Sequence, residues 1–196
     1  MGKCKWRTAL QIIPKKLNGT YEIILEPKED ERGFFMRTYD HDIFAQYHMN
    51  QHWVQENHSK STKKGTIRGL HFQFPPFAEN KLVRVIRGSV FDVCVDLRKK
   101  SSTFGRWDYI ELSESNKKMI FLPRGFAHGF CTLTDECELL YKVDNCYNQK
   151  AEGGIIWNDD YININWPIND PILSRKDSML TTFKGFQILH GGLESL

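Results

Sequence analysis

The chain has 196 residues, of which 40% are hydrophobic and 26% are charged, a composition typical of a folded protein with a sizeable core. Its formal net charge of +3 is small, and Lys and Arg are interleaved with Asp and Glu, which argues against nucleic acid as a partner. No run of about 18 apolar residues is present, so the sequence excludes a membrane-spanning helix.

The cysteine pattern and the N-terminus indicate the compartment. The five cysteines are odd in number and lack Cys-x-x-Cys spacing, which predicts a reducing environment and neither a disulfide framework nor a zinc knuckle. The first 16 residues are basic but have no long apolar segment, so we expect no secretory signal peptide. The sequence predicts a cytoplasmic protein with a single domain over 1–196, in which 1–20 and 178–196 are peripheral extensions.

Most of the predicted elements are strands. Short segments rich in β-branched and aromatic residues, separated by glycine and proline turns, are expected at 21–25, 81–86, 89–97, 107–112 and 118–122. The segment 89–97 alternates, which predicts Phe91, Val93 and Val95 on one face and Asp92, Cys94 and Asp96 on the other.

Only two segments are expected to be helical, 40–49 and, as a short helix, 174–179. Many strands at roughly ten-residue spacing with few helices predict an all-β protein, an antiparallel sandwich or barrel.

Two histidine clusters could carry chemistry. In the first, His71 and Gln73 are two residues apart on a predicted strand, so their side chains share one face. Arg68 is expected on the other face of a regular strand, unless Gly69 redirects it through a bulge. In the second cluster, a turn at Pro123 to Gly125 leads into a strand that carries His128.

The two clusters resemble the two halves of a cupin metal site, which supports a cupin-like jelly roll. However, Gln73 stands where a second histidine ligand is expected, Glu79 lies too far along the chain, and Thr132 replaces an asparagine. A metal site needs about three protein ligands, and only two histidines remain. We therefore expect no bound metal.

His71 is then either a core histidine or a general base. Tyr141 alternates with apolar residues on another strand, Lys81 begins a third strand, and Asp177 lies far away in the sequence. A base, an acid, a cation and an orienting carboxylate are the groups needed to remove and return a proton beside a ketone. Sequence spacing alone does not bring them together.

A series of longer strings extends from about Tyr21 to Asp177. They are DERGFF (30–35), QENHS (55–59), RGLHFQ (68–73), KLVR (81–84), FDVCVD (91–96), PRGFAHGF (123–130), LYK (140–142), WND (157–159) and WP (166–167). Together they resemble the dTDP-4-dehydrorhamnose 3,5-epimerase family, whose fold is a cupin-like antiparallel jelly roll.

The resemblance implies a reaction in which C3 and C5 of a nucleoside-diphosphate 4-keto-6-deoxyhexose are inverted through enolates. His71 is implied as the base, Asp177 as the carboxylate that orients it, Tyr141 as the acid on the opposite ring face, and Lys81 as the cation that stabilises the enolate. No metal or redox cofactor is implied, because the ketone already acidifies both neighbouring C–H bonds.

The resemblance also implies substrate-binding residues. The diphosphate is assigned to Arg32 and Arg68, since guanidinium groups match phosphate oxygens. Tyr147 is implied to stack on the base and His128 to line the same pocket. The remaining positions that match nucleotide-binding residues of the family are Gln55, Asn57, Glu152 and Lys176.

One position departs from the family pattern, and one expectation concerns assembly. Arg37 stands where the family usually has a glutamate near the nucleotide, so nucleotide or sugar specificity is open. The resemblance further implies a homodimer with exchanged N-terminal strands, in which Arg32 serves the neighbouring subunit.

Four alternatives stay open at this point. They are a mono-epimerase acting at C3 or C5 only, a 3,4-ketoisomerase of a related jelly-roll family, a metal-dependent cupin dioxygenase, and a non-catalytic sugar-binding cupin module.

Overall fold

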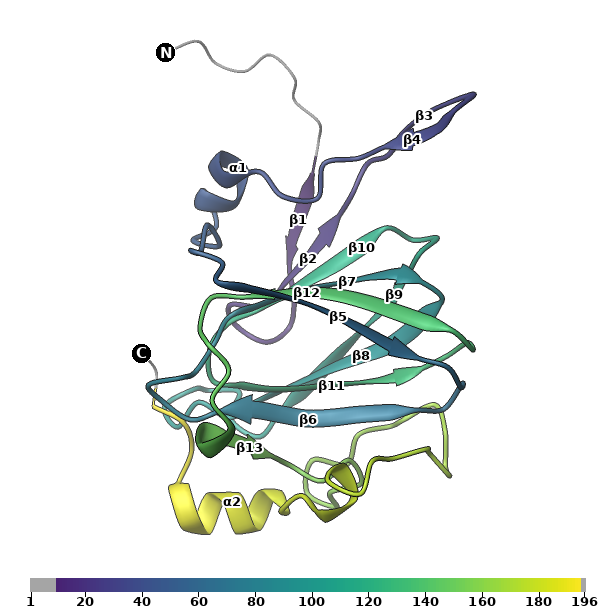
Figure 1. Cartoon of the computed structure of the whole chain (residues 1–196). Coiled ribbons are helices and arrows are strands. Elements are labelled where there is room, and N and C mark those ends of the chain that lie inside the picture. The colour runs from purple at the N-terminus through teal and green to yellow at the C-terminus, as the bar shows by residue number, and fades with distance from the viewer. Residues whose placement is uncertain (1–9, 195–196) are drawn as a thin grey trace.

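Two antiparallel β-sheets pack face to face in the computed structural model, which describes residues 10–194 (Figure 1). The six-stranded sheet has the spatial order β1 (Gln11–Pro14), β2 (Tyr21–Ile24), β10 (Lys118–Leu122), β7 (Lys81–Arg87), β12 (Cys137–Val143) and β5 (Gln55–Ser61). The five-stranded sheet has the order β13 (Glu152–Gly154), β6 (Ile67–Gln73), β11 (Phe126–Thr132), β8 (Ser89–Asp96) and β9 (Trp107–Ser113). The predicted all-β, cupin-like jelly roll is confirmed.

The expected strands are also confirmed. Each of the five segments forms a strand (β2, β7, β8, β9 and β10) whose ends differ from the prediction by at most one residue. The alternation in β8 is confirmed as well: Cys94 packs into the apolar interior between the sheets, whereas Val93 and Val95 pack on the opposite, outer face. Both faces of β8 are therefore covered by other parts of the chain, which explains why apolar residues occur on both of its faces.

The outer face of the six-stranded sheet is covered by α1 (His41–Ala45) and the turn after it. The Asp40 carboxylate accepts a hydrogen bond from the Ile43 N–H and caps the helix, and Phe44 is fully buried against the sheet. The helix ends at Ala45 instead of continuing to Met49, so the second half of that prediction is wrong. His48 has a φ of 57°, a backbone conformation that ends the helical path.

The outer face of the five-stranded sheet is covered by a helix that the sequence analysis missed, α2 (Phe183–His190). Thr182 caps its N-terminus, and Gly191, with a φ of 67°, ends it. Phe183 and Phe186 are buried, but Ile188 is 74% exposed. An internal glycine, Gly185, together with exposed apolar residues hides the amphipathic pattern on which a helix prediction depends.

The segment 174–179 contains one short 3₁₀ turn, η2 (Asp177–Met179), and a second one, η1 (Gln149–Ala151), precedes β13. A small hairpin of β3 (Lys28–Asp30) and β4 (Gly33–Phe35) projects away from the two main sheets (Figure 1). Its apolar side chains face solvent, with Phe34 53% and Phe35 66% exposed. Among residues 10–194, no helix has the length and apolar character needed to cross a membrane.

Candidate active site

Two adjoining cavities are lined by strands of both sheets and share His71, Lys81 and Tyr141 in their walls. The first has a volume of about 420 Å³ and is also lined by Arg68, His128, Lys176 and Asp177. The second has a volume of about 340 Å³ and is also lined by Gln55, Asn57, Tyr147 and Glu152. We refer to the two cavities together as the cleft. Eleven of the twelve predicted site residues therefore lie around one space.

Strand alternation brings the residues of the six-stranded sheet into the cleft. In β5, Gln55 and Asn57 line the cleft, whereas the intervening Glu56 points to the other face and pairs with Lys142. In β7, Lys81 lies on the same inner face as Val83. In β12, Tyr141 lies on the same inner face as Leu139. The period of two, which is readable in the sequence, fixes which side chains can meet substrate.

A bulge in the five-stranded sheet brings Arg68 to the same side as His71. The register between β6 and β11 shifts between the pairs His128–His71 and Phe130–Arg68, and Gly69 has a φ of 113°. A Cβ at Gly69 would lie 2.6 Å from the His128 carbonyl oxygen, so the close approach of the two strands requires glycine. The expected bulge is confirmed, and the regular-strand alternative for Arg68 is wrong.

His71 and Asp177 form a hydrogen-bonded pair despite 106 residues of sequence separation. His71 Nε2 lies 2.7 Å from Asp177 Oδ1, and the Asp177 side chain is 5% exposed. Burial raises the pKa of Asp177, but hydrogen bonds from His71, the Gly69 N–H and Ser174 outweigh this effect and hold the pKa below its ordinary value. The carboxylate is therefore ionised at neutral pH and fixes the imidazole so that Nδ1 is the nitrogen free to accept a proton.

Tyr141 stands across the cleft from the histidine pair, because it comes from the opposite sheet. Burial and, to a smaller extent, the negative charge of Glu79 raise the pKa of its hydroxyl. The Lys81 ammonium lies 6.0 Å from the centre of the Tyr141 ring and 2.8 Å from Glu79 Oε1. Tyr141 is thus a protonated hydroxyl beside a cation, facing a base.

His128 makes a second histidine–carboxylate pair. Its Nε2 lies 2.9 Å from Asp92 Oδ2 and 3.0 Å from Oδ1, and Asp92 is fully buried. His128 and His71 face each other in register on β11 and β6. The Nε2 atom of each histidine is held by its own carboxylate. Residues 10–194 contain no group of three or more His, Cys, Asp or Glu side chains arranged to bind a metal.

The other end of the cleft carries groups suited to a nucleotide. The Tyr147 ring is 58% exposed, and its hydroxyl donates a 2.8 Å hydrogen bond to Glu152. Glu152 also pairs with the Lys176 ammonium at 2.6 Å, and Gln55 accepts a hydrogen bond from the Tyr147 N–H. This arrangement offers a flat aromatic face beside a cation.

Arg32 is the one predicted site residue that lies outside the cleft of its own chain. It sits in the turn between β3 and β4, its side chain is 82% exposed, and it pairs with Asp30. Arg37, the departure from the family pattern, lies 2.9 Å from Asp40, the residue that caps α1, and lines neither cavity. In this chain Arg37 therefore supports the start of α1.

Sequence reasoning missed four residues that hold the site together. Asp92 was assigned to the correct face of β8 but not to His128, and Ser174 supports Asp177 by accepting a hydrogen bond from its N–H at 3.0 Å. Gln73 and Glu79 were examined only as replaced metal ligands, yet their side chains join at 3.0 Å next to Lys81. The alternation of β8 and the spacing from Ser174 to Asp177 were the signals available for the first two.

The comparisons with known proteins agree with this geometry. The family model of dTDP-4-dehydrorhamnose 3,5-epimerase matches residues 14–185. A dTDP-4-dehydrorhamnose 3,5-epimerase from Shigella flexneri is 52% identical over 158 residues, which cover 79% of this chain and 87% of that protein.

Two solved structures of the same fold carry ligands. The Bacillus anthracis dTDP-4-dehydrorhamnose 3,5-epimerase with TDP and PPi bound has a TM-score of 0.87 and 40% identity, covering 89% of this chain and all of that one. The dTDP-6-deoxy-D-glucose-3,5-epimerase of Legionella pneumophila in complex with dTDP-4-keto-L-rhamnose has a TM-score of 0.89 and 33% identity, covering 96% of this chain and all of that one. The chain thus belongs to the dTDP-4-dehydrorhamnose 3,5-epimerase family.

Proposed function

We propose that this chain inverts C3 and C5 of a dTDP-linked 4-keto-6-deoxyhexose, converting dTDP-4-dehydro-6-deoxyglucose to dTDP-4-dehydrorhamnose. The observation that carries the proposal is the placement of His71, backed by Asp177, and Tyr141 on opposite sheets around one cleft. Two proton-transfer groups on opposite sides of a sugar ring produce inversion, whereas one group alone returns the proton to the face it came from.

The reaction begins with removal of a proton next to the ketone. His71 Nδ1 takes the C5 proton, the electrons of the C–H bond move toward the C4 oxygen, and an enolate forms. Asp177 stabilises the resulting imidazolium through the 2.7 Å hydrogen bond. Tyr141 then donates its hydroxyl proton to C5 from the opposite face, and the C4 ketone reforms. His71 passes its proton to solvent and the Tyr141 phenolate takes one up from solvent, so that the same sequence acts at C3.

Lys81 supplies positive charge to the enolate oxygen. Its side chain is only 13% exposed, so water screens its charge weakly. Preorganised charge at a developing oxyanion is typically worth about 3–4 kcal/mol of transition-state stabilisation. The ammonium has three N–H donors, and the bond to Glu79 leaves donors for the substrate oxygen.

The residues proposed to bind the nucleotide line the same cleft. Tyr147 stacks on the base, Arg68 and Lys176 face the diphosphate, and Gln55 and Asn57 contact the nucleotide from β5. Glu152 positions both Tyr147 and Lys176 through its two hydrogen bonds. TDP and a dTDP-sugar are the ligands of the two similar structures, which supports a thymidine nucleotide.

Arg32 completes the diphosphate site only if a second copy of the chain provides it. The β3–β4 hairpin projects away from the two main sheets of its own chain (Figure 1). Its residues Arg32, Phe34 and Phe35 are exposed. The proposed assembly is therefore a homodimer in which N-terminal strands are exchanged and each hairpin reaches the neighbouring cleft. The cytoplasm is the proposed location, because the cysteine pattern indicates a reducing compartment.

The test is solvent exchange. The chelator-treated protein is incubated with dTDP-4-keto-6-deoxyglucose in heavy water, and deuterium at C3 and C5 is followed by NMR. We expect deuterium at both carbons and its loss in His71→Ala. The matched control is His58→Ala, which removes an exposed histidine from the outer face of β5.

Each other outcome leads to a different assignment. Deuterium at one carbon identifies a mono-epimerase, which uses the same base and acid. Activity that is present in the untreated protein and lost after chelator treatment identifies a metal-dependent reaction. Substrate binding without exchange, unaffected by His71→Ala, identifies a sugar-binding module and rejects the proposal.

A further inference from the structure

Glu79 is a charged residue in the cleft that the proposed reaction does not use. Its carboxylate is 11% exposed and lies 2.8 Å from Lys81 Nζ through Oε1. Its other oxygen, Oε2, accepts a 3.0 Å hydrogen bond from Gln73 Nε2. Both oxygens are therefore engaged, and the pair lies where water screens charges weakly.

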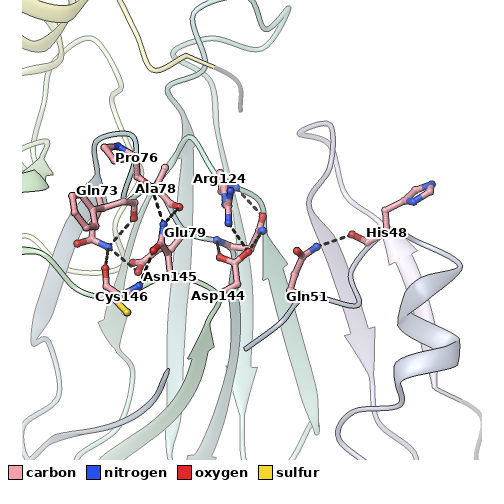
Figure 2. Close-up of polar contacts among 12 residues, drawn as sticks. His48, Gln51, Gln73, Pro76, Ala78, Glu79, Arg124, Asp144, Asn145 and Cys146 are labelled. Carbon is pink, nitrogen blue, oxygen red and sulfur yellow. Dashed lines mark hydrogen bonds and ion pairs between the residues drawn. The ribbon is translucent and has the colours of Figure 1, made fainter. Parts of the chain in front are cut away.

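Gln73 anchors this carboxylate to two separate parts of the chain. Its amide nitrogen also donates to the Phe77 carbonyl at 3.0 Å and lies 3.3 Å from the Cys146 carbonyl, and its amide oxygen accepts from the Asn148 N–H at 2.7 Å. Figure 2 shows the Gln73 side chain in contact with both Glu79 and Cys146. Glu79 is thus fixed relative to β6 and to the loop after β12, and it cannot swing away from Lys81 without breaking these bonds.

We propose that Glu79 is a positioning residue for the epimerisation: its carboxylate aims the Lys81 ammonium and offsets its charge, so that Tyr141 keeps its proton until an enolate forms. The inference rests on the proposed function, because it assigns Tyr141 as the acid. Glu79 acts through Lys81 and Tyr141 rather than on the sugar itself.

The charges around Tyr141 explain why the offset is needed. The ionisable groups that line the first cavity with Tyr141 come from β6, β7, β11 and the segment of η2; they are Arg68, His71, Lys81, His128, Lys176 and Asp177. In the second cavity Tyr141 also shares the walls with Glu79, Tyr147 and Glu152, and Glu152 is paired with Lys176. Asp92 and Asp177 are each paired with a histidine. Glu79 is therefore the carboxylate that balances the Lys81 cation next to the tyrosine, and its negative charge contributes to the raised pKa of Tyr141.

Removal of this charge has a defined chemical consequence. Without Glu79, Lys81 and Arg68 favour the tyrosinate form of Tyr141. A tyrosinate cannot donate a proton to the enolate, so the fraction of competent enzyme falls as pH rises. When the substrate is converted to its enolate, the new negative charge lies on the Lys81 side of the cleft, and the proton is then released from Tyr141 to carbon.

The test is Glu79→Gln, which keeps the size of the side chain and an oxygen acceptor for Lys81 but removes the charge. Tyr141 is titrated in the substrate-free protein by tyrosinate absorbance, with Tyr141→Phe used to assign its signal among the seven tyrosines. We expect a lower Tyr141 pKa in Glu79→Gln, an alkaline limb of kcat/KM that moves to lower pH by the same amount, and a kcat about tenfold lower.

Two further variants separate charge from shape. Glu138→Gln removes one carboxylate from the outer face of β12, the strand that carries Tyr141, and should leave the titration unchanged. Glu79→Asp keeps the charge and should restore the position of the alkaline limb.

The outcomes distinguish a failure of the role assigned to Glu79 from a failure of the proposed epimerase function. If the Tyr141 titration and the alkaline limb do not move in Glu79→Gln, or if Glu79→Asp and Glu79→Gln shift them equally, the role assigned to Glu79 is overturned. The titration uses no substrate, so it stands even if the protein fails to epimerise the sugar, a failure that the heavy-water experiment would reveal separately.

Discussion

Tyr141 and His71 face each other from different sheets, so removal of a single oxygen atom can test the role of Tyr141 separately from that of His71. Tyr141→Phe removes only the hydroxyl. His71 can still take the C5 proton, exchange it with solvent and return deuterium to the same face. We expect inversion to fall by about 10²–10⁴-fold while deuterium exchange at C5 persists. The measurement is NMR of the recovered sugar nucleotide, and an equal loss of exchange and inversion would reject Tyr141 as the opposite-face acid.

The lowered pKa of Asp177 predicts that the free energy of unfolding depends on pH. Its pKa in the folded protein is lowered, against about 3.9 in an unfolded chain. The unfolded state therefore binds the proton more readily, so the stabilisation by Asp177 is fully present above about pH 4 and is lost as pH falls through the folded-state pKa. Thermal melts between about pH 6 and pH 2.5 should show Asp177→Asn converging with the parent protein at the acidic end.

The control for this experiment is Asp170→Asn, which changes an exposed carboxylate. A difference between parent and Asp177→Asn that is constant across the whole range would mean that the charge of Asp177 contributes nothing to folding.

At the residue scale, the sequence predicts best what strand alternation controls. Gln55, Asn57 and Tyr141 were assigned through motif resemblance, and the period of two explains why they face the cleft. Residue spacing alone could not bring Asp177 to His71, because the two are separated by 106 residues, and only the family resemblance assigned them to each other. The pairing of Glu79 with Lys81 was equally hidden, since Glu79 matched an incomplete metal pattern and this suggested a lost ligand.

At the scale of elements, the bulge at Gly69 connects folding with substrate binding. Gly69→Ala places a Cβ 2.6 Å from the His128 carbonyl in a backbone conformation with φ of 113°. We expect destabilisation of about 1–3 kcal/mol from the backbone strain alone and displacement of Arg68 from the cleft, which raises KM for the nucleotide sugar. Chemical denaturation and steady-state kinetics measure the two effects.

Gly33→Ala is the matched control for this substitution. Gly33 also has a positive φ, 126°, but a Cβ there would have no atom within 4 Å. The variant reports the conformational cost without the clash. Equal destabilisation by both substitutions would show that β6 and β11 are not packed closely enough at Gly69 to exclude a Cβ.

The elements themselves were predictable to different degrees. The five strands for which bounds were predicted were found to within one residue, because their β-branched and aromatic runs end at glycine and proline turns. Helix α2 was missed because its buried Phe183 and Phe186 are accompanied by exposed Ile188 and Leu189, so the apolar residues do not form one stripe. Its N-cap, Thr182, is clear only once the helix is known.

At the scale of the whole molecule, the proposed exchange of hairpins predicts complementation between two inactive chains. In a heterodimer of Arg32→Ala with His71→Ala, one cleft combines an intact His71 with an intact Arg32 from the other chain, and the second cleft lacks both. We expect each parent variant to be strongly impaired and the doubly tagged, purified heterodimer to recover about half of the activity of the unmodified dimer.

The alternative arrangement gives a different result. If Arg32 serves the cleft of its own chain, every cleft in the heterodimer lacks one of the two groups, and no activity returns. A monomeric protein at assay concentration, measured by light scattering, would reject the exchange outright. The single-domain organisation of 1–196 stays a prediction at this scale.

The position of α2 also bears on how the protein is made. Phe183, Phe186 and Leu193 seal an apolar surface on the five-stranded sheet that includes Leu70, Phe72 and Val93. On the ribosome this surface is synthesised about a hundred residues before its cover, so it stays uncovered until Phe183, Phe186 and Leu193 have emerged. Asp177 emerges in the same late stretch. A chain that stops prematurely therefore lacks both its seal and its histidine partner, which makes a truncated product inactive and a natural substrate for chaperones and proteases.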